Sequence, residues 1–131
     1  MLSDFPPFAT IAVKNLEAVR PFYEGILGFK PIGAAVRGAQ SFRVSGAGVV
    51  IYESPLAGTN KATAVTWSVG DRLDEIVQAL DARHVPFEHY EMPGVTLEGH
   101  VHVVGDGEPS RVAWFTDPDG NIHNLNNGSA A

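Results

Sequence analysis

The same order of predicted elements occurs twice along the chain, and this repetition constrains the fold more than any other feature of the sequence. In each half a short β-prone run precedes an amphipathic helix, and three further β-like runs follow. Apolar residues recur every three or four positions from Leu16 to Leu27 and again from Leu73 to Leu80. We therefore expect an α+β fold made of two βαβββ modules. The predicted strands are residues 8–13, 29–36, 40–44, 49–53, 62–69, 85–91, 111–116 and 121–126.

Residues with strong local preferences mark the ends of the two predicted helices. Asn15 and Asp71 stand where N-cap residues are expected, because a short polar side chain can accept a hydrogen bond from the first helical turn. Gly28 should end the first helix, and His84 occupies the position after the second helix where glycine commonly adopts a left-handed conformation. Pro21 lies inside the first pattern, either in the first turn or in the interior of the helix.

The length of 131 residues predicts a single domain, residues 1–131, rather than two independent ones. Within it we expect a first module at residues 5–54, a polar linker at 55–61 and a second module at 62–127. The second module carries an inserted loop, residues 92–109, which is rich in Gly, Pro and Glu. A long loop in a compact repeat is more often functional or flexible than idle.

Composition excludes several classes of partner and site. The net charge is -6 and there is no run of Lys or Arg, which argues against nucleic acid and anionic membranes as partners. No apolar stretch reaches the roughly 20 residues that span a bilayer, and the opening MLSDFPPF lacks the features of a signal peptide. We therefore expect a cytoplasmic protein. The absence of cysteine excludes disulfides, thiolate nucleophiles and cysteine-ligated metals.

Two motifs, in this order, give the chain a family resemblance. NLEAVRPFYEGILGF near the start and WFTDPDGNIHNL near the end resemble the vicinal-oxygen-chelate superfamily, which includes glyoxalase I, bleomycin-resistance proteins and extradiol dioxygenases. The two modules that the resemblance requires cover nearly the whole chain. It implies an open, curved mixed sheet whose concave face holds a ligand, and it implies a homodimer.

The resemblance also identifies the positions at which metal-using members carry their ligands. These positions are Phe8, Tyr52, Ala64 and Asn124 in this sequence. None is His or Glu, and the side chains of Phe8 and Ala64 cannot coordinate a metal. We therefore expect that the usual metal site is absent and that the protein needs no cofactor.

Strand alternation provides an independent view of the same positions, because residues two apart share a face. Val65 and Trp67 form the apolar set expected to pack on helices, which leaves Ala64 on the other face. The predicted ligand pocket consists of Phe8, Thr10, Tyr52, Thr66, Ser68 and Asn124. Such a surface suits a small organic ligand with an aromatic or apolar body and a few polar groups. Alternatively, Phe8 and Tyr52 narrow the cavity so that it holds only water.

The histidines offer a second possible site. His100 and His102 form an H-x-H pair, which on a strand would place both rings on one face, as in metal and proton-transfer sites. The residues that could complete such a site are Glu98, Asp106, His89 and Glu91. The alternative is that these histidines are exposed polar residues of a loop. His123, by alternation, should point away from the cavity and serve packing or an interface.

The remaining charged candidates have structural alternatives. Arg43 and Arg111 either bind a carboxylate or phosphate, or are surface charges of strands. The DPDG sequence is expected to be a turn in which Asp117 accepts hydrogen bonds from its own downstream backbone and Gly120 supplies a conformation that other residues resist.

Three functional hypotheses follow from these residues and the resemblance. The first is a homodimeric protein of the bleomycin-resistance type that binds a small organic ligand, aromatic or antibiotic-like, without a metal. The second is a glyoxalase- or dioxygenase-type enzyme, a lyase, isomerase or oxygenase, with a divalent metal displaced to His100 and His102. The third is catalysis without metal, in which Tyr52 or a histidine of the loop acts as acid or base.

Overall fold

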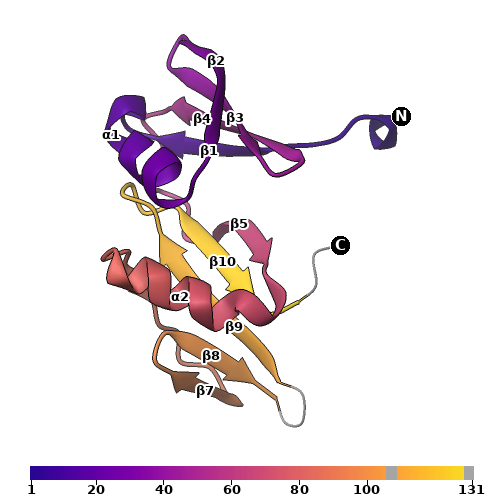
Figure 1. Ribbon diagram of the computed structural model, residues 1–131, viewed down its shortest axis with the longest axis vertical. Helices are drawn as coiled ribbons and strands as arrows, with labels where there is room; N and C mark the ends of the chain where they lie inside the picture. Colours follow the sequence, from indigo (N-terminus) through magenta and orange to yellow (C-terminus); the bar gives the residue numbers. More distant parts are fainter. Residues whose placement is uncertain (106–108, 129–131) are drawn as a thin grey trace. The chain divides into compact units, whose positions relative to one another are not determined.

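A computed structural model describes residues 1–105 and 109–128 and divides the chain into two compact units, Met1–Thr59 and Asn60–Ala131. Each unit contains helical segments and one open sheet, and Figure 1 shows both. The predicted α+β class is therefore confirmed. Within the described ranges, no helix combines the length and the apolar character needed to cross a membrane.

The first unit has a four-stranded sheet in the order β1-β4-β3-β2. Its strands are β1 (Ala9–Val13), β2 (Lys30–Val36), β3 (Ala39–Val44) and β4 (Ala47–Glu53), and the short 3-10 turn η1 (Leu2–Asp4) precedes them. β1 and β4 are parallel, whereas β4, β3 and β2 are successively antiparallel. Ile11, Phe42 and Ile51 are buried together with Val19 and Tyr23 of the helical segment, so one face of this sheet is the core.

The helical segment of the first unit is divided at Pro21. Helix α1 (Leu16–Arg20) begins as predicted, with the backbone N–H of Ala18 donating to Asn15 Oδ1 at 3.0 Å. From Pro21 the chain continues as the π-helix η2 (Pro21–Ile26), and Gly28 follows with φ of +78°. The sequence pattern predicted one continuous helix because periodicity does not distinguish α- from π-helical turns.

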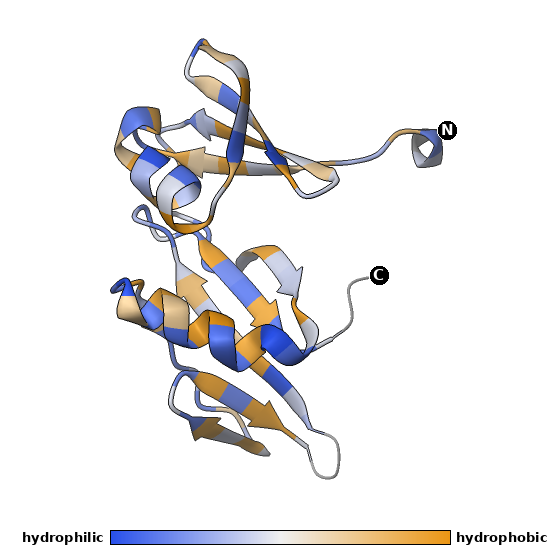
Figure 2. Ribbon diagram, in the orientation of Figure 1, coloured by the Kyte–Doolittle hydropathy of each residue, from blue (hydrophilic) through white to orange (hydrophobic). Residues whose placement is uncertain are grey.

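The second unit has a six-stranded sheet in the order β5-β10-β9-β8-β7, with β6 pairing with β9. Its strands are β5 (Thr63–Ser68), β6 (Phe87–Glu88), β7 (Val95–Glu98), β8 (Val101–Val104), β9 (Ser110–Thr116) and β10 (Ile122–Asn126). The amphipathic helix α2 (Leu73–Ala82) lies over one face of this sheet, and its apolar residues recur between polar ones in Figure 2. Buried Leu73, Val77 and Leu80 of α2 pack the core on this face.

Local geometry around α2 confirms one expectation and corrects another. His84 has φ of +62°, as predicted for the residue that ends this helix. The capping role predicted for Asp71 is wrong, because Asp71 lies inside the 3-10 turn η3 (Gly70–Arg72). Arg72 is the N-cap of α2 and makes no side-chain capping hydrogen bond.

The segment predicted as an inserted loop, residues 92–109, instead contains the antiparallel hairpin β7–β8. Val95 pairs with Val104 and Leu97 with His102. In β7 apolar residues alternate with polar ones, and β8 contains three valines, which favour strands. The richness of the segment in Gly, Pro and Glu favoured a loop, but Gly94 precedes β7 and Gly99 lies in the turn between β7 and β8. The strand predicted at 85–91 is correspondingly reduced to Phe87–Glu88.

Candidate functional site

In the first unit, the three predicted ligand-binding residues lie on the sheet face opposite the core. Phe8 is 60% exposed just before β1, Thr10 is exposed within β1, and Tyr52 is 38% exposed in β4. Their neighbours Ile11 and Ile51 are buried on the other face. The alternation of strand side chains therefore sets these residues apart from the core, as the sequence pattern predicted.

In β5 and β10 of the second unit, the face of the sheet opposite the core carries small and polar side chains. Thr66 of β5 pairs in register with Asn124 of β10, and Ser68 pairs with Asn126. Thr66 and Ser68 are exposed, and Asn124 is half-buried. We call this surface, defined by Thr66, Ser68, Trp114, Asn124 and Asn126, the polar face.

A chain of hydrogen bonds fixes the orientation of the Asn124 amide. The backbone N–H of Gly128 donates to Asn126 Oδ1 at 2.9 Å, which identifies this atom as the oxygen. Asn126 Nδ2 then donates to Asn124 Oδ1 at 3.2 Å. The Asn124 oxygen is thereby engaged as an acceptor, and the Nδ2 group of the amide carries its hydrogen-bond donors.

Trp114 is a candidate that our sequence reasoning missed. It lies directly opposite Asn124 in the antiparallel pair β9–β10, so both side chains share the polar face. Its ring packs edge to face with Tyr90 and His102, with centroid distances of 5.0 and 4.9 Å. The alternation of β9 could have identified it, because Phe115 belongs to the buried set and Trp114 must then face the other way.

His102 is a buried structural residue. Its Nε2 accepts a hydrogen bond from the backbone N–H of Tyr90 at 2.8 Å, and its Nδ1 lies 3.3 Å from the Val112 carbonyl oxygen. This pattern requires a neutral ring with the proton on Nδ1, because Nε2 acts as the acceptor. Both ring nitrogens are therefore engaged within the unit.

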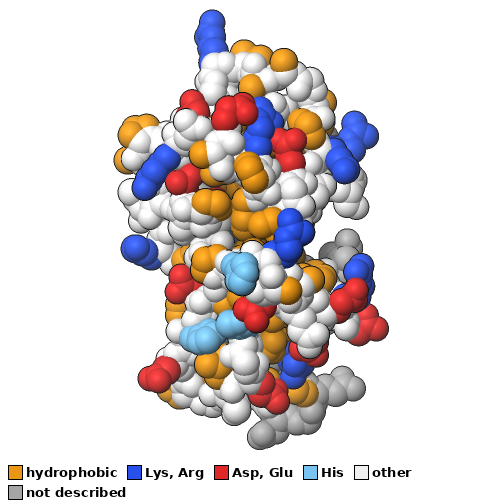
Figure 3. Space-filling model, turned by 60° about the vertical axis from the view of Figure 1, so that its left-hand side comes forward, with side chains coloured by type: hydrophobic (Ala, Val, Ile, Leu, Met, Phe, Trp, Pro, Cys, Tyr) orange, Lys and Arg blue, Asp and Glu red, His pale blue; other side chains and the backbone are white. Residues whose placement is uncertain are grey.

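The ring of His89 lies between the two predicted histidines, with centroid distances of 5.1 Å to His100 and 6.3 Å to His102. His100 precedes β8, and its Nε2 lies 3.0 Å from Asp81 Oδ1 on α2, while its Nδ1 lies 2.8 Å from His89 Nε2. The ring stacks on Phe87 with a centroid distance of 4.4 Å. Figure 3 shows histidine side chains gathered beside acidic ones on the surface of this unit.

The residues expected to complete a histidine site have other positions. Glu98 accepts a hydrogen bond from Arg111 at 3.2 Å, and Glu91 is exposed after β6. Asp106 lies outside the residues that the structure describes. Among residues 1–105 and 109–128, no group of three His, Asp or Glu side chains is arranged to hold a metal ion.

The two candidate arginines differ in their surroundings. Arg111 donates to Asp74 at 2.7 Å and to Glu98 at 3.2 Å, so carboxylates of its own unit engage its guanidinium. The hydrogen bond to Asp74, more than any other interaction, raises the pKa of Arg111 above its ordinary value. Arg43 instead lines a cavity in the first unit.

The DPDG turn is structural, as predicted. Asp117 is buried, and its Oδ1 accepts from the backbone N–H groups of Asp119 and Asn121 at 2.9 and 2.8 Å. Its Oδ2 accepts from Asn121 Nδ2 at 2.7 Å. Gly120 has φ of +88°, a conformation that disfavours other residues.

His123 packs in the core, which confirms the prediction that it points away from the ligand positions. Its Nδ1 accepts a hydrogen bond from the indole N–H of Trp67 at 3.0 Å, and its ring stacks on Phe115 at 4.7 Å. Burial disfavours the charged imidazolium and lowers the pKa of His123 to about 4.

Comparison with known proteins gives one family and several similar structures. The model of the Glyoxalase/Bleomycin resistance protein/Dioxygenase superfamily matches residues 6–124. No curated protein sequence matches significantly.

Three solved proteins illustrate the structural similarity. The fosfomycin resistance protein FosX from Listeria monocytogenes is 19% identical, with a TM-score of 0.70 and coverage of 95% of this chain and 93% of that one. A complex of this protein with Mn(II) and a sulfate ion gives a TM-score of 0.68 at 17% identity, covering 95% of this chain and 90% of that one. FosX from Mesorhizobium loti is 14% identical, with a TM-score of 0.67, and the match covers 96% of this chain and 93% of that one. An integron cassette protein from the Halifax Harbour sewage metagenome is 21% identical, with a TM-score of 0.64, and the match covers 93% of this chain and 98% of that one. At these identities the likeness concerns the fold.

Proposed function

The chain belongs to the glyoxalase/bleomycin resistance protein/dioxygenase superfamily, and from this premise we propose that it binds a small organic ligand on the open faces of its sheets without a metal ion. The observation that carries the proposal is the orientation of the Asn124 amide. Asn124 occupies a position where metal-using relatives are expected to carry a ligand, yet its oxygen is engaged by Asn126. The group that it presents is a hydrogen-bond donor.

The chemistry of the four expected metal positions supports this proposal. Phe8 and Ala64 offer only carbon, Asn124 presents N–H groups, and Tyr52 offers a single phenol. Divalent transition metals require several nitrogen, sulfur or carboxylate ligands. These residues do not fit the kind of metal that accompanies the Listeria protein in its Mn(II) complex.

The polar face suggests the chemical class of ligand. Trp114 provides an aromatic surface directly opposite the Asn124 donor, and the Thr66 hydroxyl lies beside Asn124 on the next strand. An aromatic ring packs on a planar apolar body, while amide N–H and hydroxyl groups fix an acceptor oxygen. We therefore propose an aromatic or antibiotic-like ligand that carries a carbonyl or similar acceptor. In the first unit, Phe8, Thr10 and Tyr52 are the proposed contact residues.

The geometry gives binding more support than catalysis. His102 uses both ring nitrogens internally, and His100 is held by Asp81 and His89. Tyr52 is exposed, and among the residues that the structure describes no hydrogen bond joins its hydroxyl to an acid or base. A catalytic role for Tyr52, His100 or His102 remains a prediction from the sequence.

The proposal is tested with a neutral aromatic amide, benzamide, by isothermal titration calorimetry and thermal shift. We expect binding that is unchanged by EDTA, and we expect Asn124→Asp to weaken it about tenfold, because the carboxylate accepts from Asn126 but donates nothing. Asn60→Asp makes the same chemical change in the linker and should leave binding unchanged. Loss of stabilisation on adding EDTA, or equal binding by Asn124→Asp, would contradict the proposal.

Assembly and location belong to the same proposal. We propose a homodimer, as the family resemblance implies, and a cytoplasmic location, as the sequence predicts. Analytical ultracentrifugation of the chain and fractionation of the cells that produce it would test the two points separately.

A further inference from the structure

The face of the first sheet opposite the core carries an unusual row of side chains across its four strands. Lys30 of β2 is the register partner of Arg43 in β3, and Arg43 is the partner of Gly48 in β4. Phe8, just before β1, lies beyond Gly48, since Ala9 pairs with Val49. Directly paired residues share a face. The row therefore consists of the aromatic ring of Phe8, the position of Gly48 without a side chain, and the two cations Arg43 and Lys30.

The two cations are placed against each other without a compensating carboxylate. Like charges directly opposite in an antiparallel pair destabilise a sheet. Across residues 1–105 and 109–128, neither Lys30 nor Arg43 forms an ion pair, whereas Arg20, Arg72 and Arg111 each have carboxylate partners. This arrangement occurs in a chain with 15 acidic and nine basic residues, so a shortage of carboxylates does not account for it.

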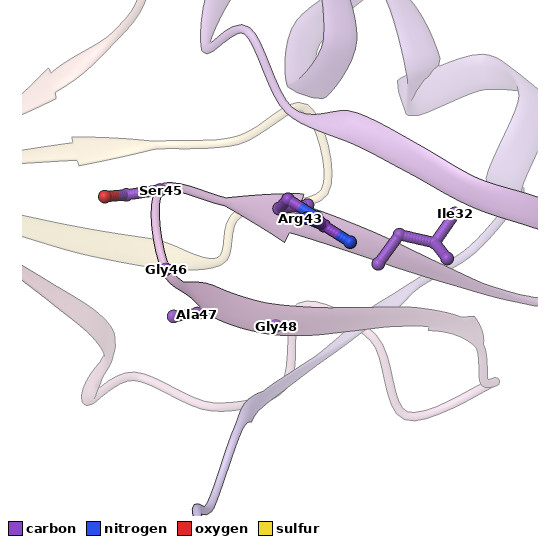
Figure 4. Close-up of a pocket in the computed structure, with 6 residues that line it drawn as sticks. All are labelled: Ile32, Arg43, Ser45, Gly46, Ala47 and Gly48. Carbon is purple, nitrogen blue, oxygen red and sulfur yellow. The ribbon is translucent and has the colours of Figure 1, made fainter.

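Gly48 leaves space between the cation and the aromatic ring. A Cβ atom at this position would meet only Phe8 Cβ and the Phe42 carbonyl oxygen, both at 3.9 Å. A cavity of about 240 Å³ lies here, lined by Ile32, Arg43, Ser45, Gly46, Ala47 and Gly48. Figure 4 shows the Arg43 side chain extending from β3 toward Ile32, with Gly48 on the neighbouring strand. The volume is below the roughly 300 Å³ at which pockets for drug-sized ligands begin.

We propose that Arg43 and Lys30 bind the acidic group of a small organic anion whose apolar body occupies the gap over Gly48 between Phe8 and Ile32. A guanidinium pairs with a carboxylate through two parallel hydrogen bonds, and a bound anion removes the repulsion between the two cations. Ile32 is 46% exposed and Phe8 60%, so both offer apolar surface to the body of the ligand. This inference rests on the proposed ligand-binding function and defines the charge of the ligand that the first unit takes.

The probe is benzoate, with benzamide as its neutral counterpart, titrated against the intact chain by calorimetry and by NMR chemical-shift mapping. We expect benzoate to bind at Arg43, Gly48 and Phe8 more tightly than benzamide does there. Arg43→Gln should weaken benzoate about tenfold and Lys30→Gln about threefold, because each removes one cation from the anion. Arg37→Gln removes a cation from the turn between β2 and β3 and should leave the affinity unchanged.

Two further variants separate binding from folding. Gly48→Leu fills the gap while keeping both cations, and we expect it to fold and to lose benzoate binding. Lys30→Glu supplies Arg43 with an internal carboxylate, so it should raise the unfolding temperature and lose benzoate binding. If Lys30 and Arg43 had only a structural role, a more stable Lys30→Glu variant would not be expected to lose benzoate binding.

The outcomes distinguish this inference from the proposed function. Benzoate binding that is unaffected by Arg43→Gln, or no benzoate binding at all, overturns the inference. If benzamide binding still depends on Asn124 in that case, the proposed function survives. If Arg43 controls benzoate while Asn124→Asp leaves benzamide unchanged, the inference stands and the proposed role of Asn124 fails.

Discussion

At the scale of single residues, the neighbouring side chains of His123 and Asn124 on β10 lie on opposite faces of the sheet and have different roles. His123 faces the core, where Trp67 and Phe115 hold it, and Asn124 faces the polar face. The period of two along a strand makes this separation predictable from sequence. The sequence does not reveal that Asn126 and Gly128 fix which end of the Asn124 amide is presented, because that depends on a hydrogen-bond chain through the backbone.

Buried His123 should make the protein sensitive to acid. Its pKa is about 4 in the folded protein against an ordinary value of 6.5, so the unfolded chain binds more protons between these values. The stability that the neutral ring contributes is complete above pH 6.5 and is lost as pH falls toward 4, by up to about 3 kcal/mol. We expect His123→Gln to flatten this part of the pH profile of the free energy of unfolding.

Urea unfolding of the wild type and of His123→Gln between pH 4 and 8 measures the effect. The difference between the two proteins isolates His123 from the carboxylates that also titrate. Parallel profiles would show that His123 is not responsible for the pH dependence.

Among the residues of the DPDG turn, truncation of Asp117 should cause the largest loss in the free energy of unfolding. Its carboxylate accepts three hydrogen bonds, two from backbone N–H groups and one from the Asn121 amide, and it is buried. Asp117→Ala leaves these donors without an acceptor, and we expect a loss of roughly 3 kcal/mol in the free energy of unfolding. Chemical denaturation measures this loss. Asp71→Ala is the control, and because Asp71 caps no helix it should change stability little.

At the scale of elements, Arg111 connects three parts of the second unit. It belongs to β9 and bonds Asp74 of α2 and Glu98 of β7. The sequence allowed either a ligand clamp or a surface charge, and it did not anticipate this link because β7 was not predicted. Asp74 lies on the predicted helix α2, whereas Glu98 lies on β7, in a segment where the sequence predicted a loop.

We expect Arg111→Gln to lower the free energy of unfolding by about 1 kcal/mol, since partly exposed ion pairs contribute little individually and two are lost together. Hydrogen exchange should rise in β7 and β8 and stay unchanged in β2 and β3. Arg72→Gln removes a pair with Glu75 that is largely exposed, and it should change neither measurement. Equal effects of the two variants would contradict the connecting role of Arg111.

The elements that sequence predicted best have strong local patterns. The stripe from Leu73 to Leu80 became α2, and the cap at Asn15 starts α1. The π-helical segment after Pro21 and the hairpin within residues 92–109 were missed. Both depend on tertiary context, which periodicity and composition do not contain.

At the scale of the whole molecule, the family was predictable because turn chemistry and repetition identify a fold, whereas the ligand depends on a few side chains. The family resemblance gave the positions of Phe8, Tyr52 and Asn124, and strand alternation added Thr10, Thr66 and Ser68 on the same faces. To identify Trp114 and the pair formed by Lys30 and Arg43, the register of the strands must be known, and the sequence alone does not give it.

The family resemblance predicts a homodimer in solution. Sedimentation equilibrium over a hundredfold range of concentration should give twice the chain mass of 14.0 kDa at the upper end. A single species at the chain mass throughout would contradict this prediction and would leave the ligand-binding proposal untouched.

The bare position at Gly48 also has a consequence for engineering. If the space above it admits the body of an organic acid, replacing Gly48 by Ala, Val and Leu in turn should reduce stepwise the size of the acid that can bind. Each larger side chain would exclude smaller acids and leave Lys30 and Arg43 unchanged. A biosensor built on this protein could therefore be adjusted to different organic acids by one substitution at position 48.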